Sequence, residues 1–260
     1  MTDERPFVRM AQEARALVEE GAAAGLALRA VGGIGVWERL GAGRRDGYAR
    51  LRPAPKDVDM IAARGTSAQI SELFAARGYV ADERLIAWRG DARHRYFLFE
   101  DGAVEPWLDV DVFLGAPPAC HAVELRDALA APGAAASATD LLLQKLQIVE
   151  TTEKDLVDIL YLLVEHELAP TATGDGLDAG HVARQLARDW GFHHTATENV
   201  EKVRRLVPEA GLNGDAAATG DRLQRLAAAI EQEPKTRRWK LRAKIGTRAQ
   251  WYEDVEELDR

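Results

Sequence analysis

Two short segments of the chain alternate aspartate with apolar residues, and they constrain the fold more than any other feature. They read "KDVDMIA" and "LDVDVF". Because successive side chains of a strand point to opposite faces, Asp57 and Asp59 share one face of the first strand. Asp109 and Asp111 share one face of the second in the same way. The pattern predicts two amphipathic strands, each with two carboxylates opposite its apolar residues.

If these strands are neighbours in one sheet, three or four carboxylates gather on one small surface. Like charges at close range are unfavourable unless something offsets them. A magnesium ion does so, because Mg²⁺ takes carboxylate oxygens and keeps waters for a phosphate substrate. Two such ions can clamp the attacking and leaving oxygens of a phosphoryl displacement. The alternative interpretation is a set of solvated aspartates on an open sheet face.

Two adjacent glycines, Gly32 and Gly33, follow the apolar run "LRAV". Glycine allows positive φ and close backbone approach, and exposed N–H groups at a helix start attract phosphate. A simple strand-to-helix turn would explain the pair equally well. The downstream aspartates favour the phosphate-binding interpretation.

The rest of the chain predicts an α/β half followed by a nearly all-helical half. The fold class is therefore α/β (α+β), with a small mixed sheet in residues 1–135 and a helical domain in residues 136–260, joined by the small-residue linker "APGAAASA". We expect a loop from Gly41 to Pro55 and a turn at Asp101-Gly102 between two strands. Helices are expected over these segments: Phe7–Ala24, Ser67–Arg77 with Ser67 as N-cap, Thr139–Glu150, Glu153–His166, Gly180–Trp190, Thr197–Leu206 and Asp221–Glu231.

Composition excludes several classes of protein. The net charge of -8 argues against a generic binder of polyanions, so any nucleic-acid contact needs a local basic patch. The single cysteine, Cys120, excludes an intrachain disulfide and is typical of a reducing cytoplasm. The charged N-terminus does not resemble a secretory signal, and no apolar stretch is long enough to cross a membrane. We expect a cytoplasmic protein with no membrane partner.

Together, "AVGG", "KDVDMIA" and "VDVF" resemble the signature of the nucleotidyltransferase superfamily related to DNA polymerase beta. The resemblance implies that Gly32 and Gly33 hold a triphosphate and that Asp57, Asp59 and Asp111 are catalytic and bind two Mg²⁺ ions. Asp111 is favoured over Asp109 as the third carboxylate because Val-Phe follows it. Asp109 is a further candidate. The gap between the glycines and Asp57 is longer than the family's usual spacing.

The helical half adds a second part of this resemblance. "LLLQKLQIVETTEKDLVDILYLL" is similar to a segment of nucleotidyltransferase toxins and their uncharacterised bacterial relatives. By that similarity Lys145 binds the nucleotide, while Lys154, Asp155 and Asp158 are further candidates that orient the lysine or the acceptor. The alternative for the two aspartates is a structural role at a helix start, with Thr152 as N-cap.

The resemblance implies a Mg-dependent enzyme that transfers a nucleoside monophosphate from an NTP to an acceptor hydroxyl. The acceptor could be tRNA or another RNA, a protein or a small molecule, and a toxin role would bring a cognate antitoxin as partner. The alternative is a non-catalytic module of the same fold that binds RNA or a protein through the basic C-terminal tail, Lys235 to Arg248. For that tail, the favoured interpretation is that Trp239, Leu241 and Ile245 pack on the helical half while the basic residues lie in water.

Overall fold

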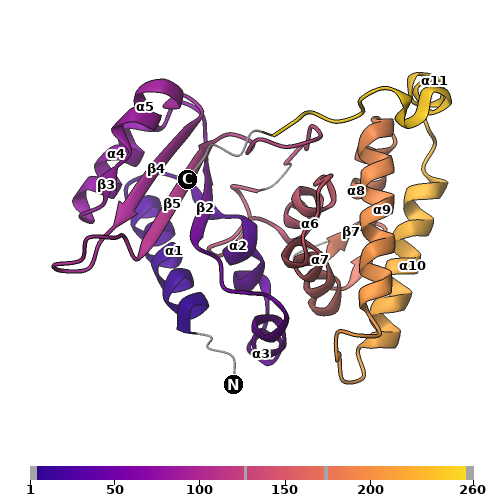
Figure 1. Cartoon of the computed structure of the whole chain (residues 1–260), viewed down its shortest axis with the longest axis horizontal. Helices are drawn as coiled ribbons and strands as arrows, with labels where there is room; N and C mark the ends of the chain where they lie inside the picture. Colours follow the sequence, from indigo (N-terminus) through magenta and orange to yellow (C-terminus); the bar gives the residue numbers. More distant parts are fainter. Residues whose placement is uncertain (1–4, 126–127, 173–174, 256–260) are drawn as a thin grey trace. The chain divides into compact units, whose positions relative to one another are not determined.

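The protein is a mixed α/β chain that divides into two compact units (Figure 1). A computed structural model describes residues 5–125, 128–172 and 175–255. The first unit comprises the described residues of Met1–Pro117 and Leu125–Ser137, and the second those of Pro118–Glu124 and Ala138–Arg260. The residues 1–4, on which part of the secretory-signal expectation rests, lie outside the described part of the chain.

A five-stranded mixed sheet forms the centre of the first unit, with strand order β1-β2-β5-β4-β3. The β2–β5 pair is parallel, and the other three pairs are antiparallel. The strands are β1 (Leu28–Ala30), β2 (Asp57–Ala62), β3 (Val80–Ala81), β4 (Arg93–Leu98) and β5 (Leu108–Leu114). The helices of this unit are α1 (Arg5–Ala23), α2 (Gly32–Arg39), α3 (Ala42–Leu51), α4 (Ser67–Ala76) and α5 (Glu83–Arg89).

One face of this sheet is apolar and carries the core of the unit. Val110 on β5 is the register partner of both Val58 on β2 and Tyr96 on β4, and all three are buried. Phe74 of α4 stacks on the Tyr96 ring with centroids 4.1 Å apart. The alternation of both strands is therefore confirmed, and the aspartates lie on the face opposite this core.

The second unit is helical, apart from a short parallel pair, β6 (Leu168–Ala169) with β7 (Leu177–Asp178). Its helices are α6 (Ala138–Leu146), α7 (Glu153–Glu165), α8 (Ala179–Leu186), α9 (Trp190–Leu206), α10 (Ala216–Gln232) and α11 (Arg237–Ile245), followed by the 3₁₀ turn Gly246–Arg248. None of the helices in the described residues is long and apolar enough to cross a membrane.

The expectation of a loop from Gly41 to Pro55 is wrong, because α3 occupies most of that segment. Its residue composition favours a loop, but Tyr48 is fully buried and packs against two aromatic rings from other helices. The Tyr48 ring lies 5.5 Å from that of Phe7 on α1 and 6.2 Å from that of Trp37 on α2. Tertiary packing therefore stabilises a helix that local propensity does not favour.

One smaller expectation also differs from the structure. Thr66, not Ser67, is the N-cap of α4, and the Ser67 hydroxyl donates instead to the Gly90 carbonyl at 2.8 Å. The predicted linker "APGAAASA" contains the boundary between the two units, which falls between Ser137 and Ala138. Its Ala136 N–H donates to the Ala30 carbonyl at 3.0 Å and the Ala136 side chain is fully buried, so the segment packs along the edge of β1.

The favoured interpretation of the basic tail is wrong for two of its three apolar residues. Leu241 and Ile245 on α11 are 64% and 48% exposed. Trp239 is half-buried, and its ring contacts that of His193 edge-on with centroids 5.1 Å apart. His193 itself belongs to α9, which begins seven residues before the predicted helix start at Thr197.

Candidate functional site

Both Asp-x-Asp segments lie side by side on the polar face of the sheet. In the parallel pairing of β2 with β5, Asp57 is the register partner of Asp109, and Asp59 is the register partner of Asp111. Neighbouring strands lie about 4.8 Å apart. Four carboxylates therefore project from one small area of the sheet, and Val58, Met60, Val110 and Val112 on the same strands face the core.

Asp111 is bound by two arginines from the adjacent strand β4. Arg93 donates through Nε to Oδ1 at 2.9 Å and through Nη2 to Oδ2 at 2.8 Å, which is a bidentate pair. Arg95, the register partner of Asp111, donates through Nε to Oδ1 at 3.1 Å and through Nη2 to Oδ2 at 3.4 Å. The Asp111 side chain is 4% exposed. Its charge is therefore balanced inside the protein.

The same contacts stabilise the charged form of Arg95. Burial opposes a charged Arg95, but its hydrogen bonds to Asp111 and the nearby charge of Asp109 outweigh burial and raise the pKa of Arg95. Sequence reasoning missed both arginines. The available signal was the alternation "RHR", which places Arg93 and Arg95 on one strand face in the same way that "DVD" places two aspartates.

The glycine pair begins α2, directly after β1, and lies against the first aspartate pair. Gly32 has a φ of 59°, which favours glycine, and a Cβ there would lie 2.4 Å from Oδ2 of Asp59. The backbone N–H of Val31 donates to the Asp59 carbonyl at 2.8 Å. Val31 is the N-cap of α2 and has no side-chain acceptor, so the first N–H groups of the helix need another partner.

Arg52 is a further cation beside this turn. A Cβ on Gly33 would lie 2.3 Å from Nη2 of Arg52, so the guanidinium fills the space that any larger residue would need. The Tyr48 hydroxyl donates to the Gly33 carbonyl at 3.3 Å, which ties α3 to the turn. Sequence analysis placed Arg52 in a loop and therefore missed its position.

The carboxylates of this face are suitable ligands for a hard cation, but they are not arranged to hold one in this structure. Asp57, Asp59 and Asp109 supply the oxygens that Mg²⁺ prefers. Among the described residues, however, no group of three or more His, Cys, Asp or Glu side chains is arranged to hold a metal ion. Asp111 keeps both oxygens on arginines, so it could complete a metal site only by exchanging those contacts for the ion.

Comparison with known proteins adds little. No protein-family model and no curated protein matches the sequence. Among solved structures, that of a candidate nucleotidyltransferase from H. pylori is similar over 87% of this chain and 97% of that protein. The sequence identity is 14% and the TM-score is 0.43. Values this low carry no inference about function.

Lys145 forms a separate charged cluster in the helical unit. Its Nζ lies 2.9 Å from Oδ1 of Asp155 and 2.8 Å from Oδ2 of Asp158, which is fully buried. Asp155 also accepts from the backbone N–H of Thr152 at 3.1 Å and forms a capping box at the start of α7. Asp155 therefore has the structural role at a helix start, and it also contacts the lysine that it is expected to orient. Lys154 is exposed on the same first turn.

Two opposing effects act on the protonation of Asp155. Burial of the carboxyl favours its neutral form, but the charge and hydrogen bond of Lys145 and the bonds from Thr152 outweigh burial and lower the pKa of Asp155. The cluster thus holds a lysine cation and two carboxylates in fixed positions on α6 and α7.

Proposed function

We propose that this protein is a Mg-dependent nucleotidyltransferase, which transfers a nucleoside monophosphate from an NTP to an acceptor hydroxyl and releases pyrophosphate. The observation that carries the proposal is the register of β2 with β5, because it sets Asp57 beside Asp109 and Asp59 beside Asp111. The glycine turn against Asp59 adds a second element that the resemblance to the superfamily leads one to expect.

In this proposal Asp57 and Asp59 hold the metal ions, and Asp111 completes one site after release from Arg93 and Arg95. Bound Mg²⁺ would neutralise charge on the triphosphate and on the attacking and leaving oxygens. The released guanidinium groups would face the same charged substrate, since they lie on the strand next to Asp111. Asp109 remains a further candidate ligand beside Asp57.

The triphosphate itself is assigned to the start of α2. The N–H groups of the first turn, beginning at Gly32 and Gly33, point away from the helix and favour an anion. Arg52 beside Gly33 adds a cation at the same place. Lys145 is assigned to the nucleotide as a point charge, with Asp155 and Asp158 as the residues that orient it. Positioning and charge neutralisation dominate such reactions, so little covalent chemistry falls to the protein.

The test is incubation with each α-labelled NTP and Mg²⁺, together with pools of RNA, protein or small metabolites. Transfer of label to one pool, with release of pyrophosphate, supports the proposal and identifies the acceptor class. Asp57→Asn should abolish transfer. Asp101→Asn, in the exposed turn between β4 and β5, is the matched control and should transfer normally. Absence of transfer with every NTP and pool would overturn the proposal.

A toxin with a cognate antitoxin is a narrower form of the same proposal. Expression of the wild type should then arrest growth, and Asp57→Asn should relieve the arrest. Normal growth with wild-type protein present at high level would refute the toxin role while leaving nucleotidyl transfer open to the assay above.

One observation favours a second candidate, a non-catalytic module of the same architecture. Asp111 is already neutralised by two arginines, so the fold balances this carboxylate without a metal. A thermal shift distinguishes the two candidates. An enzyme at an Mg-NTP concentration of 100 Kd gains about 2.7 kcal/mol in unfolding free energy by mass action. A non-catalytic module shows no change with Mg-NTP.

A further inference from the structure

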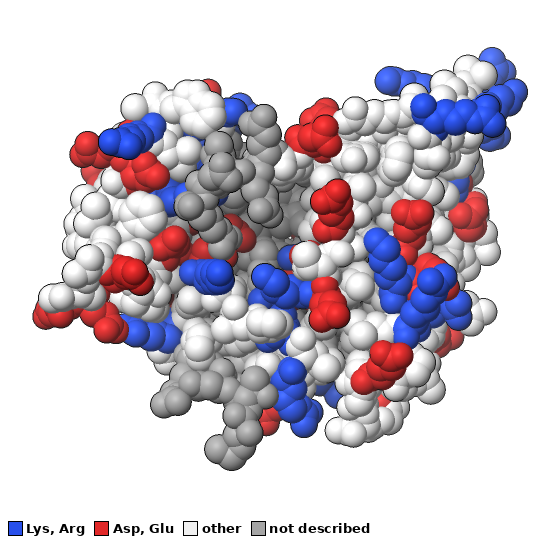
Figure 2. Space-filling view, viewed as in Figure 1, with Lys and Arg blue, Asp and Glu red and all other residues white. Residues whose placement is uncertain are grey.

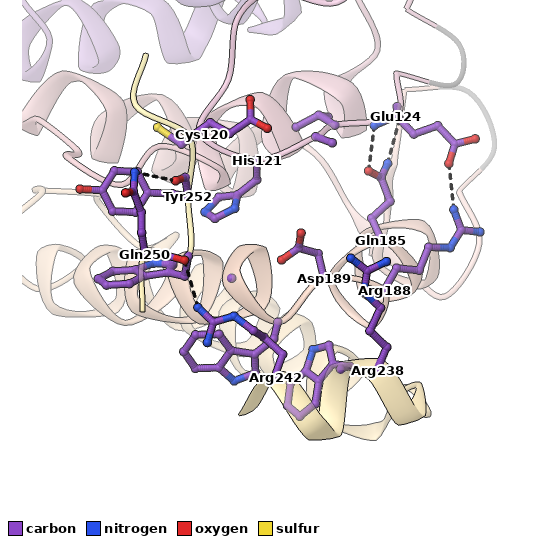
Figure 3. Close-up of a pocket in the computed structure, with 17 residues that line it drawn as sticks. Cys120, His121, Glu124, Gln185, Arg188, Asp189, Arg238, Arg242, Gln250 and Tyr252 are labelled. Carbon is purple, nitrogen blue, oxygen red and sulfur yellow. Dashed lines mark hydrogen bonds and ion pairs between the residues drawn. The ribbon is translucent and has the colours of Figure 1, made fainter. Parts of the chain in front are cut away.

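The helical unit contains a cavity of about 710 Å³ that shares no residue with the carboxylate face (Figure 3). Arg238 and Arg242 of α11 lie on one side of it, and the segment that carries Cys120, His121 and Glu124 lies on the other. A volume of this size is typical of pockets for small organic ligands. Four aromatic residues are among its lining: Trp190, Trp239, Trp251 and Tyr252.

Two arginines of this cavity have no acidic partner in the described residues. Arg242 donates to the carbonyls of Gly246 at 2.6 Å and Ala249 at 2.9 Å, and its guanidinium lies 4.8 Å from the centroid of the Trp190 ring. Arg238 is exposed and makes no hydrogen bond or ion pair within the described part of the chain. Both keep their positive charge available to a ligand.

Two of the three acidic residues in the lining already have a hydrogen-bond or ion-pair partner. Asp189 caps α9 by accepting from the backbone N–H of Phe192 at 3.0 Å. Glu124 pairs with Arg188 at 3.0 Å. Glu253 is exposed at the edge of the lining. The lining thus holds three arginines and three carboxylates, and its two arginines without an acidic partner both lie on α11, where an anion could bind.

A second row of cations lies on a different face of α11 from Arg238 and Arg242. Arg237, Lys240 and Lys244 are three and four residues apart, so they share one face of the helix. All three are exposed and without a partner among the described residues, although the chain as a whole has a charge of -8. Figure 2 shows Lys and Arg side chains gathered over this helix.

Two aromatic rings of the cavity, those of Trp251 and Tyr252, have only edge-on ring contacts within the described residues. Trp251 and Tyr252 are half-buried, with ring centroids 5.2 Å apart and an interplanar angle of 73°. The Tyr252 hydroxyl makes no hydrogen bond within the described residues. Trp190 is less suited to stacking on a base, because its ring already stacks on the imidazole of His194 and lies 4.8 Å from the guanidinium carbon of Arg242.

We propose that the cavity and the exposed face of α11 bind a single-stranded polynucleotide, with bases on the aromatic rings and phosphates along the cations. Base–aromatic stacking in a positively charged groove is the usual way to hold a single strand without reading its sequence. A duplex would offer phosphates but no free base faces. The further idea that this strand is the acceptor of nucleotidyl transfer rests on the proposed function, whereas binding itself does not.

The test is fluorescence anisotropy with labelled oligo(U) RNA and oligo(dT) DNA of about 15 nucleotides, a length near the upper site size of single-strand binding modules. A duplex of the same length serves as competitor. We expect single strands to bind and duplex to compete weakly. Tighter binding of one oligonucleotide distinguishes RNA from DNA as the source of the strand. No binding at low salt, or duplex competition equal to that of single strands, would overturn the proposal.

Matched variants separate stacking from charge. Tyr252→Ala should weaken binding roughly 5- to 100-fold because a base can no longer stack there, while Tyr252→Phe retains it. Replacing both Arg238 and Lys244 by Gln should reduce the slope of log K against log salt by about 0.7 for each phosphate that the variant no longer neutralises. Arg204→Gln removes an exposed, paired cation from α9 and should leave the slope unchanged. Equal effects of the tyrosine variants, or of the α11 and Arg204 variants, would refute the assigned contacts.

Failure of this proposal can be told from failure of the proposed function. Asp57→Asn lies in the other unit and should bind the oligonucleotides as the wild type does. If wild type transfers nucleotides to a non-nucleic-acid pool and binds no oligonucleotide, the catalytic proposal stands and this one falls. If the wild type binds single strands but transfers no nucleotide, the binding proposal stands and the catalytic one falls.

Discussion

Substitution of Asp111 by asparagine tests whether the carboxylate face depends on its internal charge balance. Asp111→Asn keeps the size of the side chain and removes its negative charge. Two guanidinium groups, those of Arg93 and Arg95, would then lose their counter-charge while remaining 18% and 13% exposed. The amide oxygen of Asn can still accept hydrogen bonds, but its NH₂ group would face guanidinium N–H donors with which it cannot pair.

The expected cost follows from the burial of all three side chains. Removing one partner of a buried ion pair costs roughly 3–5 kcal/mol, because the other charge remains desolvated. The arginines keep some access to water, so the lower end of that range, about 3 kcal/mol, is the expected loss in unfolding free energy. That would be a large fraction of the total stability of an ordinary domain.

Urea unfolding followed by circular dichroism measures this change, with Asp101→Asn as the control. Asp101 is exposed, so its substitution should shift the unfolding free energy by less than about 0.5 kcal/mol. The comparison requires equal m-values, because a changed slope would indicate a changed unfolded or native state. A loss of unfolding free energy below about 1 kcal/mol for Asp111→Asn would refute the reasoning, because a value that small is typical of solvent-exposed ion pairs.

Three further predictions concern a turn, a titration and a cap. Gly32→Ala should cost about 1–3 kcal/mol of stability and abolish any Mg-NTP thermal shift, because its Cβ would overlap the Asp59 carboxylate. Burial lowers the pKa of His121 to about 4, so the unfolded chain takes up this proton first. The unfolding free energy measured by urea titration should therefore fall as the pH drops from about 6.5 towards 4. In His121→Gln, the unfolding free energy should depend less on pH over this range than in the wild type. Asp189→Ala should lower the melting temperature through loss of about 1 kcal/mol at the start of α9, while Asp189→Asn retains the cap.

The parts of the fold that the sequence predicts are those decided by local alternation. Asp57 and Asp59 share a face because of strand geometry alone, and the same holds for Asp109 and Asp111. Local alternation does not explain why the two aspartate pairs lie next to each other. That adjacency depends on β2 and β5 pairing in parallel at one register, and a shift by one residue would put one aspartate pair on the opposite face. The sequence indicates that the two strands belong in one sheet, but it does not determine the register in which they pair.

Helix α3 shows why other parts could not be predicted. The segment around Arg44 and Gly47 has little helical propensity and no clear apolar face. It is helical because Tyr48 packs on rings that arrive from α1 and α2. The same packing carries Arg52 to the glycine turn, so the error in secondary structure and the missed cation at the site have one cause.

The arginines of β4 bear on what the polar face can do. A face built only to bind metal would leave its third carboxylate accessible, yet Asp111 is among the most buried charged residues described. Holding Asp111 with Arg93 and Arg95 stabilises the empty fold, and a metal ion must replace contacts of that strength before it can use this oxygen donor. Metal affinity should therefore be lower than the number of aspartates implies, and it should rise when one arginine is replaced by Met. An anionic substrate would change the balance, because it gives the displaced guanidinium groups a new partner. Nucleotide and metal should therefore bind with positive coupling, each strengthening the other by the same factor.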